Sequence, residues 1–336
     1  MKINIKGAGV GGSLLANLLI DEGLNVTLID IKESYYKPCG DVVPTSYNPP
    51  YKWNILNEVI HFKFIVNNST INEVSYRRPK WVVIDKKGWI DWLRNRFIRR
   101  GGNCVVSQNY WIGQEGNFTV FANGPYNMDR KVVYATRAII EGESVEGAVL
   151  EFNTKLTGFY WIFPDTDNSV NVGAGFLEFP NSRDLLLKYI STKIKRGKII
   201  DIRGAPISIS KPKKVEFSIG EAAGLVFPLS GEGIRPAAIS AEEYFKYIKL
   251  KRTLPESIYA IGSKEINSLL RKINIQRKLL EFYLRLNEER RFTFLRTLLN
   301  NEVLIDSYLG DETDYRGILE SIKAIKTLSY DRNREI

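Results

Sequence analysis

Lys2-Ile3-Asn4-Ile5-Lys6-Gly7-Ala8-Gly9-Val10-Gly11-Gly12 lies at the beginning of the chain, before an apolar-striped segment to Gly23 and the run Asn25-Val26-Thr27-Leu28-Ile29-Asp30. Apolar and polar residues alternate before the first glycine, and leucines recur at helical spacing after the last one. The pattern predicts a strand, a glycine turn, a helix and a second strand that ends in a carboxylate. This order is typical of an α/β unit that binds a dinucleotide.

Each small residue of the turn has an expected role. We expect Gly7 to turn the chain sharply out of the strand and Gly9 to leave room where a pyrophosphate approaches the backbone. Gly12 would let the helix pack closely on the sheet, and the N–H groups at the helix start would face the phosphates. Asp30 would accept hydrogen bonds from ribose hydroxyls.

Length and composition indicate a globular protein of roughly two domains. The 336 residues are 44% apolar and 26% charged, values typical of a folded chain. There is no apolar run of about 18 residues that could span a membrane and no apolar secretory segment at the beginning. Only Cys39 and Cys104 are cysteines, which favours a reducing compartment. We therefore expect a cytoplasmic protein.

The formal net charge of +10 favours anionic partners such as a membrane face, a phosphate-bearing substrate or nucleic acid, although it also fits simple solubility. The sequence contains no nucleic-acid-binding module, so we expect no nucleic-acid partner. A helix predicted over Arg183 to Lys195 has a basic side, which could face an anionic membrane or only solvent.

The middle of the chain predicts mainly strands. The predicted elements are a hairpin of Ile60–Val66 and Ile71–Tyr76, a strand at Trp81–Asp85, a helix at Trp89–Arg100, and strands at Cys104–Tyr110, Phe118–Ala122, Arg130–Ile140, Val149–Leu156, Phe159–Pro164 and Ser169–Phe176. Residues 31–53 contain several prolines and predict a loop.

A second strand–glycine loop–helix unit follows at Val215–Ile219, Gly220–Gly224 and Arg235–Lys249. Two such units about 200 residues apart, with a separate sheet between them, fit an extended dinucleotide such as FAD better than a compact NAD domain. The chain from Glu265 onward predicts helices with two apolar stripes. The stripe residues are Leu269, Leu270, Ile273, Leu280 and Leu284, and then Tyr315, Ile318, Leu319, Ile322 and Ile325.

The predicted fold class is α/β. A Rossmann-like FAD-binding domain would comprise residues 1–45, 80–127 and 212–250. An inserted antiparallel-sheet substrate domain would comprise residues 46–79 and 128–211, and residues 251–336 would form a helical C-terminal segment.

The chain offers few catalytic side chains of its own. Its one histidine, His61, has no evident Ser and Asp partners, and one histidine with two separated cysteines does not make a zinc site of usual spacing, so we expect no metal. A bound cofactor would therefore carry the chemistry, while the protein supplies position and electrostatics.

Four motifs in residues 1–250 resemble those of the geranylgeranyl reductases, p-hydroxybenzoate hydroxylase-like flavoproteins that saturate prenyl chains of archaeal membrane lipids and chlorophyll precursors. They are the glycine turn with Asp30, Lys37-Pro38-Cys39-Gly40, Phe159-x-Trp161-x-Phe163-Pro164 with Gly173-x-Gly175, and Gly220-Glu221-Ala222-Ala223-Gly224 with Pro228, Gly231, Gly233 and Ile234. The aromatic motif is the most specific of the four.

The resemblance implies an FAD-dependent oxidoreductase that reduces double bonds of geranylgeranyl chains in membrane lipids or their precursors. The implied cofactor-binding residues are Gly7, Gly9, Gly11, Gly12, Asp30, Cys39, Gly40, Val42, Lys86, Glu221, Gly233 and Ile234. The implied substrate-binding residues are Phe159, Trp161, Phe163, Pro164, Gly173 and Gly175. Cys39, Asp41 or an ordered water would supply the proton.

The same residues leave alternatives open. Glu221 stands where the family usually has aspartate, Phe159 replaces a tyrosine, and Asp41 adds a carboxylate beside Cys39. A flavin monooxygenase of the same fold, or a flavin- or lipid-binding paralogue without turnover, would also fit. The electron donor would be NAD(P)H or a ferredoxin-like protein, and the lipid substrate implies peripheral contact with the cytoplasmic membrane face.

Overall fold

The computed structural model describes residues 2–107, 118–125, 132–178, 181–210 and 216–310, together with residues 320 and 323. The chain forms two compact units. Unit 1 comprises Met1–Tyr36, Asp85–Val132 and Ile207–Arg277, and unit 2 comprises Lys37–Ile84, Val133–Pro206 and Lys278–Ile336. Among the described residues, no helix is long and apolar enough to cross a membrane.

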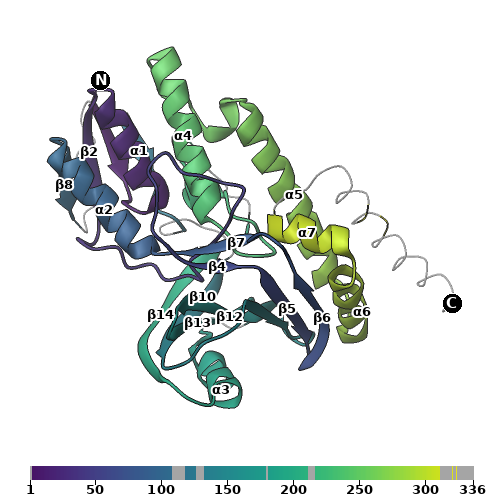
Figure 1. The fold of residues 1–336 in the computed structure, drawn as a ribbon. Helices are drawn as coiled ribbons and strands as arrows, with labels where there is room; N and C mark the ends of the chain where they lie inside the picture. The colour runs from purple at the N-terminus through teal and green to yellow at the C-terminus, as the bar shows by residue number, and fades with distance from the viewer. Residues whose placement is uncertain are drawn as a thin grey trace. The chain divides into compact units, whose positions relative to one another are not determined.

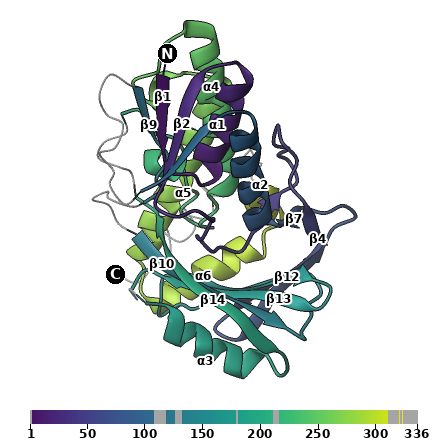
Figure 2. The same ribbon diagram turned by 90° about the vertical axis from the view of Figure 1, so that its left-hand side faces the viewer.

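Unit 1 is built on a parallel sheet with the strand order β8-β2-β1-β9. Its strands are β1 (Lys2–Lys6), β2 (Asn25–Asp30), β8 (Asn103–Val106) and β9 (Phe118–Phe121). Helix α1 (Val10–Asp21) packs against both α2 (Lys86–Arg99) and α4 (Ile234–Lys251), and Figure 2 shows β1, β2 and β9 side by side. This arrangement confirms the predicted α/β class and the first strand–turn–helix–strand unit.

The predicted strand at Val215–Ile219 is wrong as a regular element. Residue 215 lies outside the described part of the chain, and Glu216 and Ser218 form only isolated bridges, to Ser257 and Phe121. Phe217 has φ +51°, a left-handed backbone that interrupts an extended strand. The glycine loop after it forms the short helix η1 (Gly220–Ala223), and η2 (Ile258–Ala260) follows α4.

Unit 2 contains a seven-stranded sheet with the order β14-β10-β13-β12-β11-β5-β6. Its strands are β5 (His61–Val66), β6 (Ser69–Ser75), β10 (Val132–Glu141), β11 (Ala148–Phe152), β12 (Gly158–Thr166), β13 (Ser169–Phe176) and β14 (Lys198–Ser208). The predicted hairpin is confirmed, because β5 and β6 pair antiparallel across Asn67 and Asn68, both at positive φ. Strand β14 was not predicted.

A second, three-stranded sheet in unit 2 has the order β3-β7-β4, with β3 at Val42–Pro44, β4 at Ile55–Val59 and β7 at Trp81–Ile84. Residues 42–44 were expected to form a loop, and no strand was predicted at residues 55–59. They become strands because each pairs antiparallel with β7. This pairing groups residues 37–45 and 80–84 with unit 2, whereas the sequence suggested the cofactor-binding domain.

Helix α3 (Arg183–Lys193) covers one face of the seven-stranded sheet. The residues that it packs against alternate along the strands and include Tyr160, Ile162, Val172 and Ala174. Because successive strand residues point to opposite faces, Phe159, Trp161 and Phe163 lie on the other face. The face under α3 thus mixes aliphatic and aromatic side chains, whereas the other face of β12 carries three aromatic rings.

Three helices follow at the end of the described chain (Figure 1). They are α5 (Lys264–Leu284), α6 (Glu288–Leu299) and α7 (Glu302–Gly310). The predicted first apolar stripe lies on α5, where Leu269, Ile273 and Leu280 are buried. The predicted second stripe, from Tyr315 to Ile325, lies outside the described residues.

The glycine pair of the aromatic motif yields a test of the fold. Trp161 lies opposite Gly173 in the strand register, and a Cβ on Gly173 would overlap the Trp161 indole ring. A Cβ on Gly175 would meet its nearest neighbours, on Ala135 and Val133, at 3.4 Å. We expect Gly173→Ala to lower the free energy of unfolding by about 2 kcal/mol, the usual cost of overpacking, and Gly175→Ala to cost much less. Urea unfolding of both variants checks this, and equal losses would contradict it.

Candidate functional site

The glycine turn of unit 1 is shaped by close approaches of backbone to backbone. Gly7 has φ +104°, and a Cβ on Gly12 would overlap the Gly7 carbonyl oxygen, so neither position accepts a larger residue. A Cβ on Gly9 would meet only the Tyr35 ring, at 3.8 Å. The absence of a side chain at Gly9 is thus not required by packing, and it leaves space beside the start of α1.

Two helix N-termini meet in unit 1. The N-cap of α1 is Gly9 and the N-cap of α4 is Gly233, neither of which has a side chain to cap the helix. A Cβ on Gly11 would lie 3.3 Å from the Ala237 carbonyl oxygen, so the first turns of the two helices are in contact. The first N–H groups of a helix lack intrahelical acceptors and carry a partial positive charge. Their convergence favours an anion at this end of both helices.

Asp30 and Arg94 hold the glycine turn from the side. The Ala8 N–H donates to Asp30 Oδ2 at 2.8 Å, and Arg94 Nη2 donates to the same oxygen at 2.7 Å. Arg94 also donates through Nε and Nη2 to the Ala8 carbonyl oxygen at 2.9 and 2.7 Å, and through Nη1 to the carbonyls of Lys32 and Glu33. The Ala8 residue is therefore fixed at both its N–H and its C=O.

This geometry bears on the ribose role predicted for Asp30. Its Oδ1 accepts hydrogen bonds from the N–H groups of Ile31 and Lys32, at 2.6 and 3.4 Å. With the two bonds to Oδ2, both carboxylate oxygens already have donors from the protein, and the side chain is 18% exposed. Asp30 holds the loop in this structure, and contact with a ribose stays a prediction.

Lys86 and Glu221 lie in unit 1 as well. Lys86 begins α2, is buried, and places its Nζ 5.4 Å from the centroid of the Tyr35 ring, the ring that faces Gly9. Glu221 Oε1 accepts the Ser208 N–H at 2.7 Å, and Glu221 Oε2 lies 3.6 Å from a Cβ on Gly124. Glu221 therefore joins two segments that are distant in sequence.

A carboxylate on α2 fixes the chain beside Tyr35. Asp91 accepts the Tyr35 N–H at 3.0 Å and the Lys87 ammonium at 2.6 Å. Partial burial alone would raise the pKa of Asp91, but these hydrogen bonds outweigh it and hold the pKa below its usual value. At the end of β1, burial lowers the pKa of Lys6.

The predicted Cys39–Asp41 loop lies in unit 2. The Cys39 thiol donates to Asp41 Oδ1 at 2.9 Å, and the Asp41 N–H donates to Cys39 Sγ at 3.2 Å. Asp41 has φ +56°, and its carbonyl accepts the Ile84 N–H at 2.9 Å. Val42 then begins β3 and pairs with Val83. The thiol is thus hydrogen-bonded to the carboxylate within a constrained turn.

The aromatic face of β12 contacts this loop. A Cβ on Gly40 would lie 2.7 Å from the Phe163 ring, so the loop backbone rests directly on that ring. Trp161 lies between Phe163 and Phe159, with ring centroids 6.2 and 6.0 Å away. Pro164 pairs with Val170 and by alternation faces away from these rings. Unit 2 therefore brings together Gly40, Phe163 and Trp161, but not Pro164.

Two buried polar residues that were not predicted from the sequence hold the glycine turn and the Cys39–Asp41 loop. Arg94 is 5% exposed on α2, and Asn171 is fully buried on β13, where it hydrogen-bonds both Trp161 and Cys39. The signal for Asn171 was a polar residue between Val170 and Val172 in an apolar run. Arg94 gave no such signal, because arginine is common on a helix surface.

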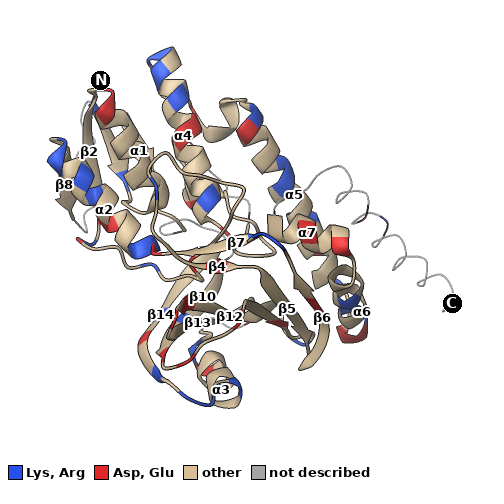
Figure 3. Cartoon of the chain, viewed as in Figure 1, with Lys and Arg blue, Asp and Glu red and all other residues tan. Residues whose placement is uncertain are grey.

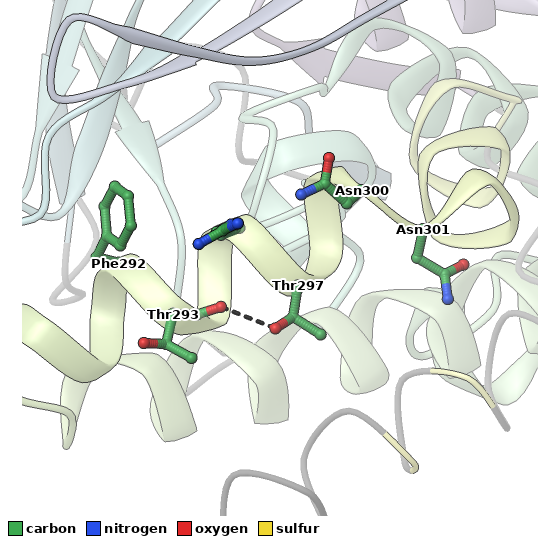
Figure 4. Close-up of a pocket in the computed structure, with 6 residues that line it drawn as sticks. Phe292, Thr293, Thr297, Asn300 and Asn301 are labelled. Carbon is green, nitrogen blue, oxygen red and sulfur yellow. Dashed lines mark hydrogen bonds between the residues drawn. The ribbon is translucent and has the colours of Figure 1, made fainter.

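Other features of the described chain do not join the predicted site. His61 contacts Ser75 and Glu146 on the sheet surface, and no group of three or more metal-ligating side chains occurs within the described ranges. A hollow of about 500 Å³ lies along α6 (Figure 4). It is lined by Phe292, Thr293, Arg296, Thr297, Asn300 and Asn301. None of the predicted site residues lines it.

Comparisons with known proteins relate the chain to flavoproteins. No protein-family model matches it. A digeranylgeranylglycerophospholipid reductase from Methanospirillum hungatei is 28% identical over 122 residues, which is 32% of this chain and about 30% of that relative. A solved geranylgeranyl bacteriochlorophyll reductase-like protein from Thermoplasma acidophilum has the same fold, with a TM-score of 0.76, 17% identity and 98% of both chains covered.

Halogenases share this fold too. A flavin-dependent brominase has a TM-score of 0.70 at 14% identity, with 99% of both chains covered. A halogenase solved in complex with FAD has a TM-score of 0.62 at 14% identity, with 96% of this chain and 85% of that chain covered. The resemblance to geranylgeranyl reductases and the fold class inferred from the sequence are confirmed. The predictions of FAD and of an oxidoreductase agree with these relatives.

The Asp30–Arg94 pair yields a test of the glycine turn. We expect Arg94→Leu to lower the free energy of unfolding by about 3 kcal/mol, because it removes the cationic partner of a mostly buried carboxylate and the donor to several backbone carbonyls. Arg100→Leu is the matched control at the C-cap of the same helix, since Arg100 is 56% exposed in its contact with Asp21 and such pairs contribute less than about 1 kcal/mol. Urea unfolding compares the two variants. A loss for Arg94→Leu no larger than that of the control would refute the holding role.

Proposed function

We propose that this chain is an FAD-dependent oxidoreductase that reduces carbon–carbon double bonds in isoprenoid chains of the geranylgeranyl type, carried by membrane lipids or their precursors. The observation that carries the proposal is the packing of the aromatic face of β12 on the Cys39–Gly40 loop in unit 2. It joins an apolar aromatic wall to a thiol–carboxylate pair, which suits a substrate that is a hydrocarbon and needs a proton.

Unit 1 has the features that FAD requires. The open position at Gly9 and the contact between the first turns of α1 and α4 offer N–H groups to a pyrophosphate. Lys86 adds a positive charge near the Tyr35 ring. A pyrophosphate would offset the repulsion between two helix N-termini held at one place. The Cys39–Val42 and Gly233–Ile234 segments are proposed to contact the flavin ring.

When bound and reduced, FAD supplies a hydride to one carbon of the double bond. The chain must deliver a proton to the other carbon and tolerate positive charge, because an isolated alkene accepts a hydride poorly. The Trp161 face would stabilise that charge by cation–π attraction, which contributes roughly 1–2 kcal/mol in a dry site. Cys39 would hold the proton, hydrogen-bonded to Asp41, until it is transferred.

The partners follow from the proposed substrate. An isoprenoid lipid implies peripheral contact with the cytoplasmic membrane face, and the net charge of +10 would favour an anionic surface. Basic residues occur on α3 and α4 (Figure 3). Lys188 and Lys195 are exposed, whereas Lys193 pairs with the buried Glu151 at 3.0 Å. The electron donor is proposed to be NAD(P)H or a ferredoxin-like protein.

A flavin-dependent monooxygenase or halogenase is the second candidate, because solved halogenases cover nearly the whole chain with the same fold. The two candidates differ in their need for oxygen. Reduction of a double bond proceeds without oxygen, whereas oxygenation and halogenation by a flavin consume it.

The experiment that tests the proposal is anaerobic reduction of the FAD-loaded protein with dithionite, followed by addition of a geranylgeranyl phospholipid. We expect the lipid to reoxidise the flavin and to gain two hydrogens for each bond reduced, as measured by absorbance and mass spectrometry. Reoxidation by oxygen alone, with unchanged lipid, would instead favour the second candidate or a paralogue without turnover.

The open position at Gly9 yields a specific prediction for the cofactor. Gly9→Ala adds a methyl group that meets only Tyr35 within the protein, so the apoprotein should unfold at the wild-type temperature. The same methyl group occupies the space proposed for the pyrophosphate, and FAD affinity should fall by about tenfold to a hundredfold. Flavin fluorescence titration measures this. Gly204→Ala, with its nearest neighbour at 3.4 Å, is the control and should bind FAD normally. Unchanged affinity of Gly9→Ala would contradict the proposed phosphate position.

A further inference from the structure

Asn171 lies on β13 with no solvent exposure, and both ends of its amide are engaged. Its Oδ1 accepts the Trp161 Nε1–H at 3.0 Å, and its Nδ2 donates to the Cys39 carbonyl oxygen at 3.1 Å. The indole can only donate and the carbonyl can only accept, so the orientation of the amide follows from its partners. Asn171 thus connects the aromatic strand to the loop that carries the thiol.

The Cys39–Asp41 loop is also held at Gly40 and Asp41. Gly40 rests on the Phe163 ring, the Asp41 carbonyl accepts the Ile84 N–H, and the Asp41 N–H donates to Cys39 Sγ. The direction of the Cys39 carbonyl follows the rotation of the Cys39–Gly40 peptide, and this rotation sets where Gly40 and Asp41 lie relative to the Cys39 thiol. The bond from Asn171 acts directly on this rotation.

We propose that Asn171 is a positioning residue that holds Cys39 so that its thiol donates to Asp41. This inference rests on the proposed function for its catalytic meaning, since the Cys39–Asp41 pair would hold the proton for the double bond. The geometry itself requires neither flavin nor lipid.

The chemistry of the position explains why asparagine stands there. A residue between a donor and an acceptor must accept at one end and donate at the other. Aspartate has the same shape and can accept from Trp161, but in its ionised form it cannot donate to the Cys39 carbonyl and would repel it. Leucine has a similar volume and can do neither. Both substitutions remove the donor to the Cys39 carbonyl, but only aspartate keeps the shape of asparagine and the acceptor for Trp161. An effect common to both variants therefore comes from the lost bond to Cys39 and not from altered packing.

The test is infrared spectroscopy of the Cys39 S–H stretch in a Cys104→Ser background, where only one thiol remains. In the parent protein we expect the band at the lower frequency of a thiol that donates to a carboxylate. Asp41→Asn provides the reference position for loss of that charged acceptor. N171D and N171L should both shift the band in the direction of this reference. W161F removes the indole donor and part of the ring but leaves the bond from Asn171 to the Cys39 carbonyl available, so it should shift the band less.

Three results would overturn the proposal. A band in N171D and N171L that stays at the parent frequency would show that Asn171 does not act on the thiol. A band that does not move in Asp41→Asn would show that the thiol–carboxylate bond is not formed. A shift in W161F as large as that in N171D would assign the effect to general loosening of the strand. N171D keeps the shape of asparagine, so it gives the answer if N171L fails to fold.

A kinetic measurement separates this inference from the proposed function. If the chain reduces isoprenoid lipids, N171D should lower kcat by about tenfold, the effect of about 1.4 kcal/mol or one buried hydrogen bond, while KM for the lipid changes little. A protein that shows the S–H shifts but never reduces lipid would retain the positioning role and refute the reductase proposal. A normal kcat in N171D, in a protein that does reduce lipid, would refute the positioning role in catalysis.

Discussion

The hydrogen bonds between Ala8, Asp30 and Arg94 are the constraint on which unit 1 depends. Ala8 lies between two glycines of the turn and would otherwise be free to rotate, yet its N–H and its C=O are both held. The guanidinium that holds it is buried, and a buried guanidinium is tolerated only when its donors are satisfied. The carbonyls of Lys32 and Glu33, together with Asp30, satisfy them. The end of β2, the glycine turn and α2 are thereby fixed as one structure.

Unit 2 uses the same principle with a neutral side chain. Asn171 holds the Cys39 carbonyl from a strand, as Arg94 holds the Ala8 carbonyl from a helix. In both cases a loop proposed to contact the cofactor is fixed through its backbone by a buried side chain on a regular element. Fixing the backbone leaves the loop side chains available for chemistry. Groups supported by regular elements are also held closer to one geometry than groups on an unsupported loop.

The parts of the fold that could be predicted are those that depend on residues close together in the sequence. The glycine turn, the β5–β6 hairpin and the strands β12 and β13 follow from local patterns, because glycine requirements and alternation are set within a few residues. The strands β3 and β4 were missed because only their pairing with β7 makes them strands. Strand β14, with Lys198, Asp201 and Arg203, lacks a clear apolar face in the sequence.

The site shows the same division. Gly9 could be recognised because its role needs only an absent side chain beside a helix start. Arg94 and Asn171 could not, since their partners Asp30 and Cys39 are 64 and 132 positions away. Asp30 was assigned to the ribose from its place at the end of β2, but the carboxylate also accepts hydrogen bonds from the Ala8 N–H and the Arg94 guanidinium. A sequence position indicates what a carboxylate can bind and not which donors reach it first.

The shared fold separates what binds the cofactor from what chooses the reaction. Halogenases and a geranylgeranyl reductase-like protein have the same architecture over nearly the full chain, so the glycine turn and the paired helix N-termini say little about which substrate is transformed. The differences must come from side chains that face the substrate. In this chain the side chains that we propose to face the substrate are the aromatic face of β12 and the Cys39–Asp41 pair. Under that proposal an apolar wall would select a hydrocarbon, and the thiol would supply a proton. Both properties would suit saturation of a double bond better than chemistry that requires oxygen.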